Sequence, residues 1–228
     1  MISFKSLRSL LAITAVEDLD LCHMDVKVAF LNGVLPENER VYMSVPAGLN
    51  ASAGQVCELR KGLFGLKQSP RIWNNELNRH LESLGFTRCI TDPCLYVRRV
   101  DGELLIVGLF VDDLAIASSS TTQRDWLKGQ LTQKYSMTDE GDLTHFLGLQ
   151  IERDREARTL KVHQARYIED VLERFNMQNC DRVSTPAEPK LRLSAEMGPT
   201  SEDDIEFMKS RNYRSAVGSL MYAMVATR

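Results

Sequence analysis

Two adjacent aspartates interrupt one of the most apolar stretches of the chain. Asp112 and Asp113 lie in the middle of LLIVGLFVDDLAIASSS, residues 104–120, where both flanks have the composition of buried strands. Two apolar strands joined by a short turn would place both carboxylates at the tip of a hairpin. Like charges this close repel each other, and a divalent cation such as magnesium, which prefers oxygen ligands, offsets that repulsion. The alternative is a turn that contains aspartate for backbone reasons alone.

A third carboxylate, Asp25, lies in the apolar segment HMDVKVAFLNG. A lone aspartate in a strand also serves as a cap at the strand end, so its position alone does not define a site. Together, Asp25, Asp112 and Asp113 predict a carboxylate site for two metal ions. Such a site steadies the attacking and leaving oxygens of an in-line displacement at phosphorus.

The composition is that of a globular protein, with 228 residues of which 43% are hydrophobic and 26% charged. This length suits one large domain or two small ones. No apolar run is long enough to span a membrane, and the start is a poor signal peptide, so we expect an intracellular chain. The five cysteines are scattered without a Cys-x-x-Cys pair, which favours reduced thiols over a zinc site or disulfides.

The net charge of −3 is not typical of a nucleic-acid-binding protein. Residues 57–99 nevertheless carry eight lysines and arginines against four acidic residues. This excess predicts a modest basic patch that could contact phosphates. An ordinary solvated surface is the alternative.

The hydrophobic pattern predicts helices and strands in no strictly alternating order. Helical spacing is found over residues 5–17, 71–85, 121–135, 165–177 and 213–226. Strands are expected over residues 21–33, 39–46, 94–100, 103–110, 114–118, 145–154 and 158–164, with a hairpin turn at Asp101-Gly102. This mixture indicates an α+β fold with an antiparallel sheet.

Seven segments, spread over nearly the whole chain, stand in the order found in one protein family. They are HMDVKVAFLNG, VYMSVPAGL, CELRKGLFGLKQSPRIWN, DPCLYVRR, LFVDDLAIAS, FLGLQIERD and YRSAVGSLMYAMVATR. Together they resemble the reverse transcriptase (RNA-dependent DNA polymerase) of copia-type LTR retrotransposon Pol polyproteins. FVDD alone would be a weak match, whereas LRKGLFGLKQSPRIWN is long and specific.

The resemblance implies a right-hand polymerase. Residues 1–150 would form the palm, an antiparallel sheet with packed helices, together with partial fingers. A thumb-like hairpin and helix would follow over 151–183, a linker over 184–206 and the start of a connection region over 207–228. The family normally has a preceding segment with a KARLVAKG-like basic stretch and continues past the last residue, so we expect a chain truncated at both ends.

The resemblance also implies metal ligands. Asp25 and Asp112 would bind two Mg²⁺ ions, which Mn²⁺ could replace, with Asp113 as a supporting ligand. The backbone carbonyl of Val26 would also contact metal. Phe30 would be a steric gate that clashes with a ribose 2′-OH and so selects dNTPs, while core packing is the alternative role for its ring.

Further residues would contact nucleic acid by the same resemblance. The loop and helix start that support the incoming nucleotide and template would be formed by Gly65, Lys67, Gln68, Ser69, Pro70 and Arg71. Lys67 and Arg71 are otherwise unremarkable surface cations. The hairpin that grips the primer terminus would contain Phe146, Leu147 and Gly148.

The implied reaction is RNA-directed DNA synthesis, in which dNTPs are added to a primer 3′-OH by two-metal phosphoryl transfer. The expected partners are an RNA or DNA template with its primer, dNTPs, and other Pol segments such as RNase H and integrase, but no membrane. The expected location is the cytoplasm, in a virus-like particle. The alternatives are a catalytically inactive fragment that lacks finger strands, and a nucleic-acid-binding remnant.

Overall fold

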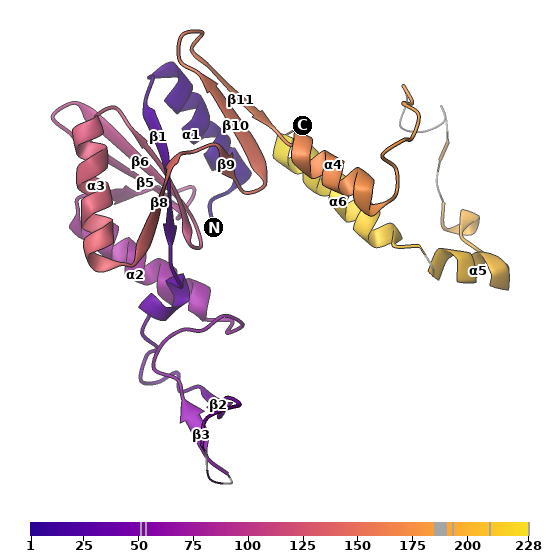
Figure 1. Cartoon of the computed structure of the whole chain (residues 1–228), viewed down its shortest axis with the longest axis horizontal. Coiled ribbons are helices and arrows are strands. Elements are labelled where there is room, and N and C mark those ends of the chain that lie inside the picture. The colour runs from indigo at the N-terminus through magenta and orange to yellow at the C-terminus, as the bar shows by residue number, and fades with distance from the viewer. Residues whose placement is uncertain (51, 53, 185–190, 193, 210, 228) are drawn as a thin grey trace. The chain divides into compact units, whose positions relative to one another are not determined.

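The structure is a computed structural model that describes residues 1–50, 52, 54–184, 191–192, 194–209 and 211–227 (Figure 1). Part of the expected linker, residues 185–190 and 193, lies outside the described residues. The chain divides into two compact units. The first comprises Met1–Phe146 and Glu152–Lys161, and the second comprises Leu147–Ile151 and Val162–Arg228.

An antiparallel sheet of six strands forms the centre of the first unit. In spatial order the strands are β4 (Thr87–Arg88), β5 (Leu95–Val100), β6 (Glu103–Phe110), β7 (Asp113–Ser118), β1 (Asp20–Val26) and β8 (Met137–Asp142). β1, the first strand along the chain, therefore lies between β7 and β8 and pairs with both. The expected α+β fold with an antiparallel sheet is confirmed.

The helix α1 (Phe4–Val16) packs on one face of this sheet. Gly108 of β6 permits its close approach, because a Cβ at Gly108 would lie 2.8 Å from the Cδ1 of Ile2 and 3.3 Å from the Cδ1 of Leu10. Gly108 pairs with Ala115 of β7, so both residues lie on the α1 face.

The opposite face carries α3 (Thr121–Lys134). The guanidinium of Arg98 stacks on the ring of Trp126 in α3, 4.3 Å from its centroid. Arg98 pairs with Leu105, which lies three residues before Gly108 on β6 and therefore points away from the α1 face. The third helix of the unit, α2 (Ser69–Ser83), buries the apolar stripe Ile72, Trp73, Leu77 and Leu81.

Two predicted strands are shorter in the structure. The strand expected over 21–33 ends at Val26, because Val28 adopts a left-handed conformation (φ 49°) and the chain continues as the short 3₁₀ helix η1 (Ala29–Asn32). The strand expected over 39–46 is reduced to β2 (Tyr42–Ser44), which pairs with β3 (Val56–Glu58).

A turn divides the strand that was predicted over 145–154. β9 (His145–Phe146) ends before Leu147 and Gly148, which both have positive φ, and β10 (Leu149–Asp154) follows. Together with β11 (Thr159–His163), these strands form a three-stranded sheet in the order β11-β10-β9. The hydrophobic pattern alone does not reveal this turn, since Leu147 is an apolar residue.

The second unit is mainly helical. Its helices are α4 (Ala165–Arg174), the 3₁₀ helix η2 (Ala195–Met197), α5 (Glu202–Lys209) and α6 (Tyr213–Thr227). The hydroxyl of Tyr167 on α4 donates a hydrogen bond to the carbonyl of Ser219 on α6 (3.1 Å), and the Tyr167 ring lies 4.9 Å from the ring of Tyr222. Among the described residues, no helix has both the length and the apolar character needed to cross a membrane.

Candidate active site

The two adjacent aspartates lie at the tip of the β6–β7 hairpin, as predicted. β6 ends at Phe110, Val111 and Asp112 form the turn, and β7 begins at Asp113, which pairs with Phe110. Both strands are buried over most of their length, so the polar tip is exceptional within them.

β1 brings the third aspartate to the same place. Asp25 lies opposite Asp113 in the β1–β7 register, and the backbone N–H of Val26 donates to the carbonyl of Asp112 at 2.8 Å. Residues directly opposite each other in an antiparallel pair present their side chains on the same face. Partial burial, followed by the negative charges of Asp112 and Asp113, raises the pKa of Asp25 above its ordinary value of 3.8. The charges of Asp112 and Asp113 therefore act on Asp25.

This donor set fits a hard divalent cation. Carboxylate oxygens are the ligands that Mg²⁺ prefers, and a cation would offset the repulsion that acts on Asp25. Within the described ranges, however, no group of three or more histidine, cysteine, aspartate or glutamate side chains is placed closely enough to hold a metal ion. The roles of Asp25, Val26, Asp112 and Asp113 as metal ligands therefore remain predictions.

The turn between β6 and β7 is strained and is held by a tryptophan. Val111 has φ 56°, a left-handed conformation that is unfavourable for a β-branched residue. The indole N–H of Trp73 on α2 donates to the carbonyl of Val111 at 2.6 Å, and the Trp73 side chain is only 1% exposed. The helical spacing over residues 71–85 predicted α2 but gave no sign of this polar contact.

His23 is a second residue that sequence reasoning missed. It lies two positions before Asp25 on β1, and its Nε2 is 2.8 Å from the Oδ1 of Asp113. Its ring also lies edge-on to Phe146, with 5.8 Å between the centroids. The period of two along a strand was an available signal, because it places His23 on the same face as Asp25.

A cavity of about 270 Å³ adjoins the aspartate turn. Its lining includes Val111 of the turn and three residues that were predicted to contact nucleotide or template, namely Phe30, Pro70 and Arg71. The guanidinium of Arg71 donates to Glu39 at 2.8 Å. The Arg71 side chain is 63% exposed and that of Glu39 is 34% exposed. Three segments that are distant in sequence therefore meet at this cavity.

Phe30 is both packed and adjacent to the cavity. It lies on η1, is 7% exposed, and its ring lies 4.7 Å from the ring of Phe64 in a T-shaped arrangement. Core packing and a gate for nucleotides are therefore compatible roles for this ring.

The predicted binding loop before α2 contains both buried and exposed side chains. The hydroxyl of the buried Ser69 donates to the carbonyl of Leu63 (2.8 Å), so this side chain stabilises the loop itself. Lys67 is exposed, Gln68 is half-buried, and Gly65 is exposed with φ 94°. A Cβ at Gly65 would contact nothing within 4 Å, so its positive φ explains the glycine.

The predicted primer-binding residues fall in both compact units. Phe146 is buried at the end of β9 in the first unit. In the second unit, the hydroxyl of Tyr222 donates to the carbonyl of Leu147, and a Cβ at Gly148 would lie 2.9 Å from that hydroxyl. Tyr222 thus fixes the tight turn at Leu147 and Gly148.

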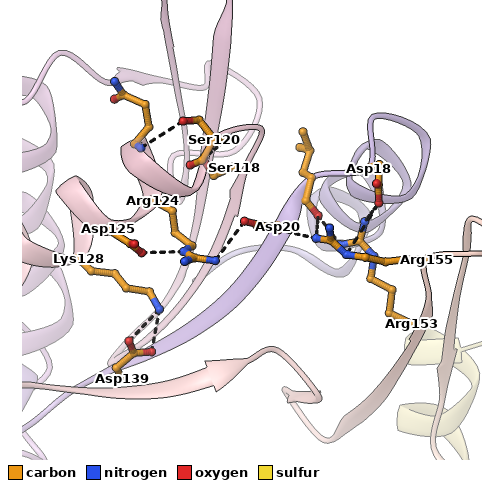
Figure 2. A network of polar contacts seen from close by, with 12 residues as sticks. Asp18, Asp20, Ser118, Ser120, Arg124, Asp125, Lys128, Asp139, Arg153 and Arg155 are labelled. Carbon is orange, nitrogen blue, oxygen red and sulfur yellow. Dashed lines mark hydrogen bonds and ion pairs between the residues drawn. The ribbon is translucent and has the colours of Figure 1, made fainter.

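A network of ion pairs holds the start of β1 (Figure 2). Asp20 accepts hydrogen bonds from Arg124 of α3 (3.1 Å) and from Arg155, which follows β10. Nearby, Lys128 of α3 binds Asp139 of β8 at 2.8 Å. These contacts join α3 and β8 to the strand that carries Asp25.

Comparison with known proteins agrees with the resemblance of the motifs. Residues 1–189 match a family model described as reverse transcriptase (RNA-dependent DNA polymerase). The chain is 41% identical over 231 residues to the retrovirus-related Pol polyprotein from transposon TNT 1-94 of Nicotiana tabacum, a match that covers 100% of this chain and 17% of the relative. It is 36% identical over 224 residues to the retrovirus-related Pol polyprotein from transposon RE1 of Arabidopsis thaliana, which covers 97% of this chain and 15% of the relative.

The chain thus spans about a sixth of the length of these curated relatives. Its match to the family model extends over most of its own length, and both relatives are retrotransposon polyproteins. This chain belongs to the reverse transcriptase (RNA-dependent DNA polymerase) family, in the form found in copia-type Pol polyproteins of plant transposons.

Proposed function

We propose that this chain is the RNA-directed DNA polymerase domain of a copia-type retrotransposon and adds dNTPs to a primer 3′-OH. The observation that carries the proposal is the meeting of Asp25 with the Asp112–Asp113 turn, through the β1–β7 register and the Val26 hydrogen bond. The raised pKa of Asp25 supports it, because a site built to bind cations concentrates negative charge.

In this proposal the six-stranded sheet and its helices serve as the palm, which with partial fingers occupies residues 1–150. Residues 151–183 serve as a thumb-like hairpin and helix, 184–206 as a linker, and 207–228 as the start of a connection region. The high amphipathicity of α4, which has no buried residue, supports a role in contacting a partner such as the template–primer duplex.

Asp25 and Asp112 would hold two Mg²⁺ ions, with Asp113 and the Val26 carbonyl as further ligands. When bound, such ions stabilise the charge that develops on phosphate oxygens during an in-line displacement. In the reaction the primer 3′-oxygen forms a bond to the α-phosphorus, the bond to the bridging oxygen breaks, pyrophosphate leaves, and the hydroxyl proton passes to solvent. The chain's own part is to hold the reactants in line and to place fixed charge around them.

The cavity beside Val111 is the proposed place of the incoming nucleotide. Phe30 would exclude a ribose 2′-OH. Arg71 would release its ion pair with Glu39 and contact a phosphate of the nucleotide instead. The exposed Lys67 and Gly65, the half-buried Gln68 and the inward-facing Ser69 would form the supporting loop before α2. Phe146, Leu147 and Gly148 would contact the primer terminus.

We further propose an RNA or DNA template with its primer, and RNase H and integrase segments, as partners in a cytoplasmic virus-like particle.

The test is primer extension on an RNA template with dNTPs and Mg²⁺. Asp112→Asn should lower extension at least about a hundredfold, since it removes a charged ligand and leaves the shape of the side chain unchanged. Asp101→Asn is the matched control, because Asp101 lies in the turn at the other end of β6, where φ is 52° and asparagine is well tolerated. It should extend primers as the wild type does.

Undiminished extension by Asp112→Asn would refute the metal role of this turn. A folded wild-type chain that binds the template–primer duplex but does not extend it would instead support a nucleic-acid-binding remnant. Folding is checked by circular dichroism for every variant.

A further inference from the structure

His23 contacts two parts of the proposed site at once. Its Nε2–H donates to the Oδ1 of Asp113 at 2.8 Å, and its ring lies edge-on to Phe146, with centroids 5.8 Å apart and an interplanar angle of 83°. Asp113 belongs to the aspartate turn, whereas Phe146 is among the residues proposed to hold the primer. All three residues belong to the first compact unit.

The strand register explains how one side chain reaches both neighbours. Asp25 lies opposite Asp113, and His23 lies opposite Ala115, so Asp113 is the diagonal neighbour of His23 on the same face. A diagonal neighbour is within reach of a long or aromatic side chain. The small Ala115 opposite His23 leaves space for the imidazole to lean towards Asp113.

The hydrogen bond restrains one of three carboxylates that repel each other. Asp25 lies opposite Asp113, and the N–H of Val26 donates to the carbonyl of Asp112, so the position of the Asp113 carboxylate affects how much negative charge surrounds Asp25. With Oδ1 engaged by His23, the remaining oxygen of Asp113 that can bind another ligand is Oδ2. The His23 side chain is 19% exposed and that of Asp113 is 33% exposed, so water competes only partly for this bond.

The edge-on ring contact restrains Phe146 in a different way. Phe146 is 3% exposed and ends β9, immediately before the turn at Leu147. An aromatic pair of this geometry contributes beyond simple burial of area, and it favours one orientation of each ring. Loss of the imidazole would therefore leave the Phe146 ring free to reorient.

We propose that His23 is a positioning residue that orients the Asp113 carboxylate for metal binding and the Phe146 ring for primer binding. The inference rests on the proposed polymerase function and deepens it. The two effects act through different parts of the imidazole. The Nε2–H donates to Asp113, and the ring packs edge-on against Phe146. Substitutions that keep only the donor or only the ring can therefore separate the two effects.

Two variants make this separation. His23→Gln keeps an N–H at about the reach of Nε2 but has no ring, and His23→Phe keeps a ring but has no donor. We expect His23→Phe to weaken Mn²⁺ binding about tenfold with little change in template–primer affinity, because it loses the hydrogen bond to a charged group. We expect His23→Gln to weaken template–primer affinity about threefold to tenfold while Mn²⁺ binding stays within about twofold of the wild type.

Both constants are measured without turnover. Mn²⁺ binding is followed by electron paramagnetic resonance, and binding of a labelled template–primer duplex by fluorescence anisotropy. His145→Gln is the control, since His145 is exposed, precedes Phe146 on β9, and is 3.1 Å from the hydroxyl of Thr144. If His23→Phe does not fold, His23→Leu is compared with His23→Gln. Leucine lacks both the ring and the donor and should weaken both constants, whereas glutamine should weaken template–primer affinity alone, so the difference in Mn²⁺ binding isolates the donor.

Equal effects of both variants on both constants, or no effect on either, would overturn the proposal. Primer extension by the wild type, run in parallel, separates this failure from failure of the proposed function. An inactive wild type whose variants still show the crossed pattern would refute polymerase activity and leave the positioning role of His23 standing. An active wild type whose His23 variants match it in both constants would support polymerase activity and refute the positioning role of His23.

Discussion

The hydrogen bond from Trp73 to the aspartate turn offers a quantitative test of how the site is held. Trp73→Phe keeps an aromatic ring in the core but removes the indole N–H that donates to the carbonyl of Val111 at 2.6 Å. That bond is expected to contribute about 1 kcal/mol, and leaving the carbonyl without its partner costs about 1–3 kcal/mol. The left-handed conformation of Val111 costs about 1–2 kcal/mol. The bond and the strain are thus of similar size, and the variant turn should relax.

Relaxation of the turn would displace Asp112, which follows Val111 directly. A loss of about 1.4 kcal/mol from the transition state lowers the rate about tenfold. We therefore expect single-turnover primer extension by Trp73→Phe to be about tenfold slower than that of the wild type. Trp126→Phe is the matched control, since Trp126 stacks on Arg98 and does not contact the turn.

A double-mutant cycle with Val111→Gly isolates the strain. Glycine adopts a positive φ without a steric penalty, so the turn should then need the indole less. In the Val111→Gly background, Trp73→Phe should slow extension by clearly less than tenfold, with a coupling energy of about 1 kcal/mol. Urea unfolding of all four proteins reports stability separately. If Trp73→Phe lowers stability but not the extension rate, or if the effects on rate are additive within about 0.3 kcal/mol, the reasoning is wrong.

Two further substitutions test other parts of the chain. Phe30→Ala should admit ribonucleotides, because it opens the cavity that Phe30 lines beside Val111; an unchanged ratio of rNTP to dNTP incorporation would assign Phe30 to packing alone. Burial alone would raise the pKa of Asp92, but hydrogen bonds from Ser6, Ser3 and Cys94 outweigh it and lower the pKa below its ordinary value of 3.8. Because folding lowers the pKa of Asp92, its carboxylate stabilises the protein at pH values above its pKa in the unfolded chain. This stabilisation is lost as the pH falls through its lower pKa in the folded chain. Asp92→Asn should therefore be less stable than the wild type by about 1–2 kcal/mol near pH 7, with a smaller difference near pH 3; urea unfolding that shows equal differences at both pH values would contradict this.

Much of the fold could be predicted because local patterns encode it. The apolar runs on both sides of Asp112 and Asp113 predicted the hairpin, and the apolar stripe from Ile72 to Leu81 predicted α2. β8 (Met137–Asp142) was not predicted, because MTDEGD is acidic and lacks alternating apolar residues. It forms by pairing with β1, a long-range interaction that no local pattern reports.

The candidate site was predicted less completely, for a similar physical reason. The three aspartates stand out by their apolar surroundings, and the motif resemblance joined them. His23 and Trp73 act through contacts with residues that are distant along the chain. The period of two along a strand places His23 on the face of Asp25, but no local pattern reveals the partner of either residue. The left-handed conformation of Val111 opposes the preference of a β-branched residue and is therefore hidden from propensity arguments.

The position of β1 between β7 and β8 has a consequence for how the protein folds. His23 and Asp113 are 90 positions apart, so the carboxylates cannot meet until β7 has been synthesised and its chain has closed a long loop onto β1. The second neighbour, β8, comes later still, so one edge of β1 waits for β7 and the other edge waits for β8. Pairings between such distant segments slow folding and leave strand edges open to association with other chains. The carboxylate site can therefore form only after β7 has been synthesised, well after Asp25 itself has emerged from the ribosome.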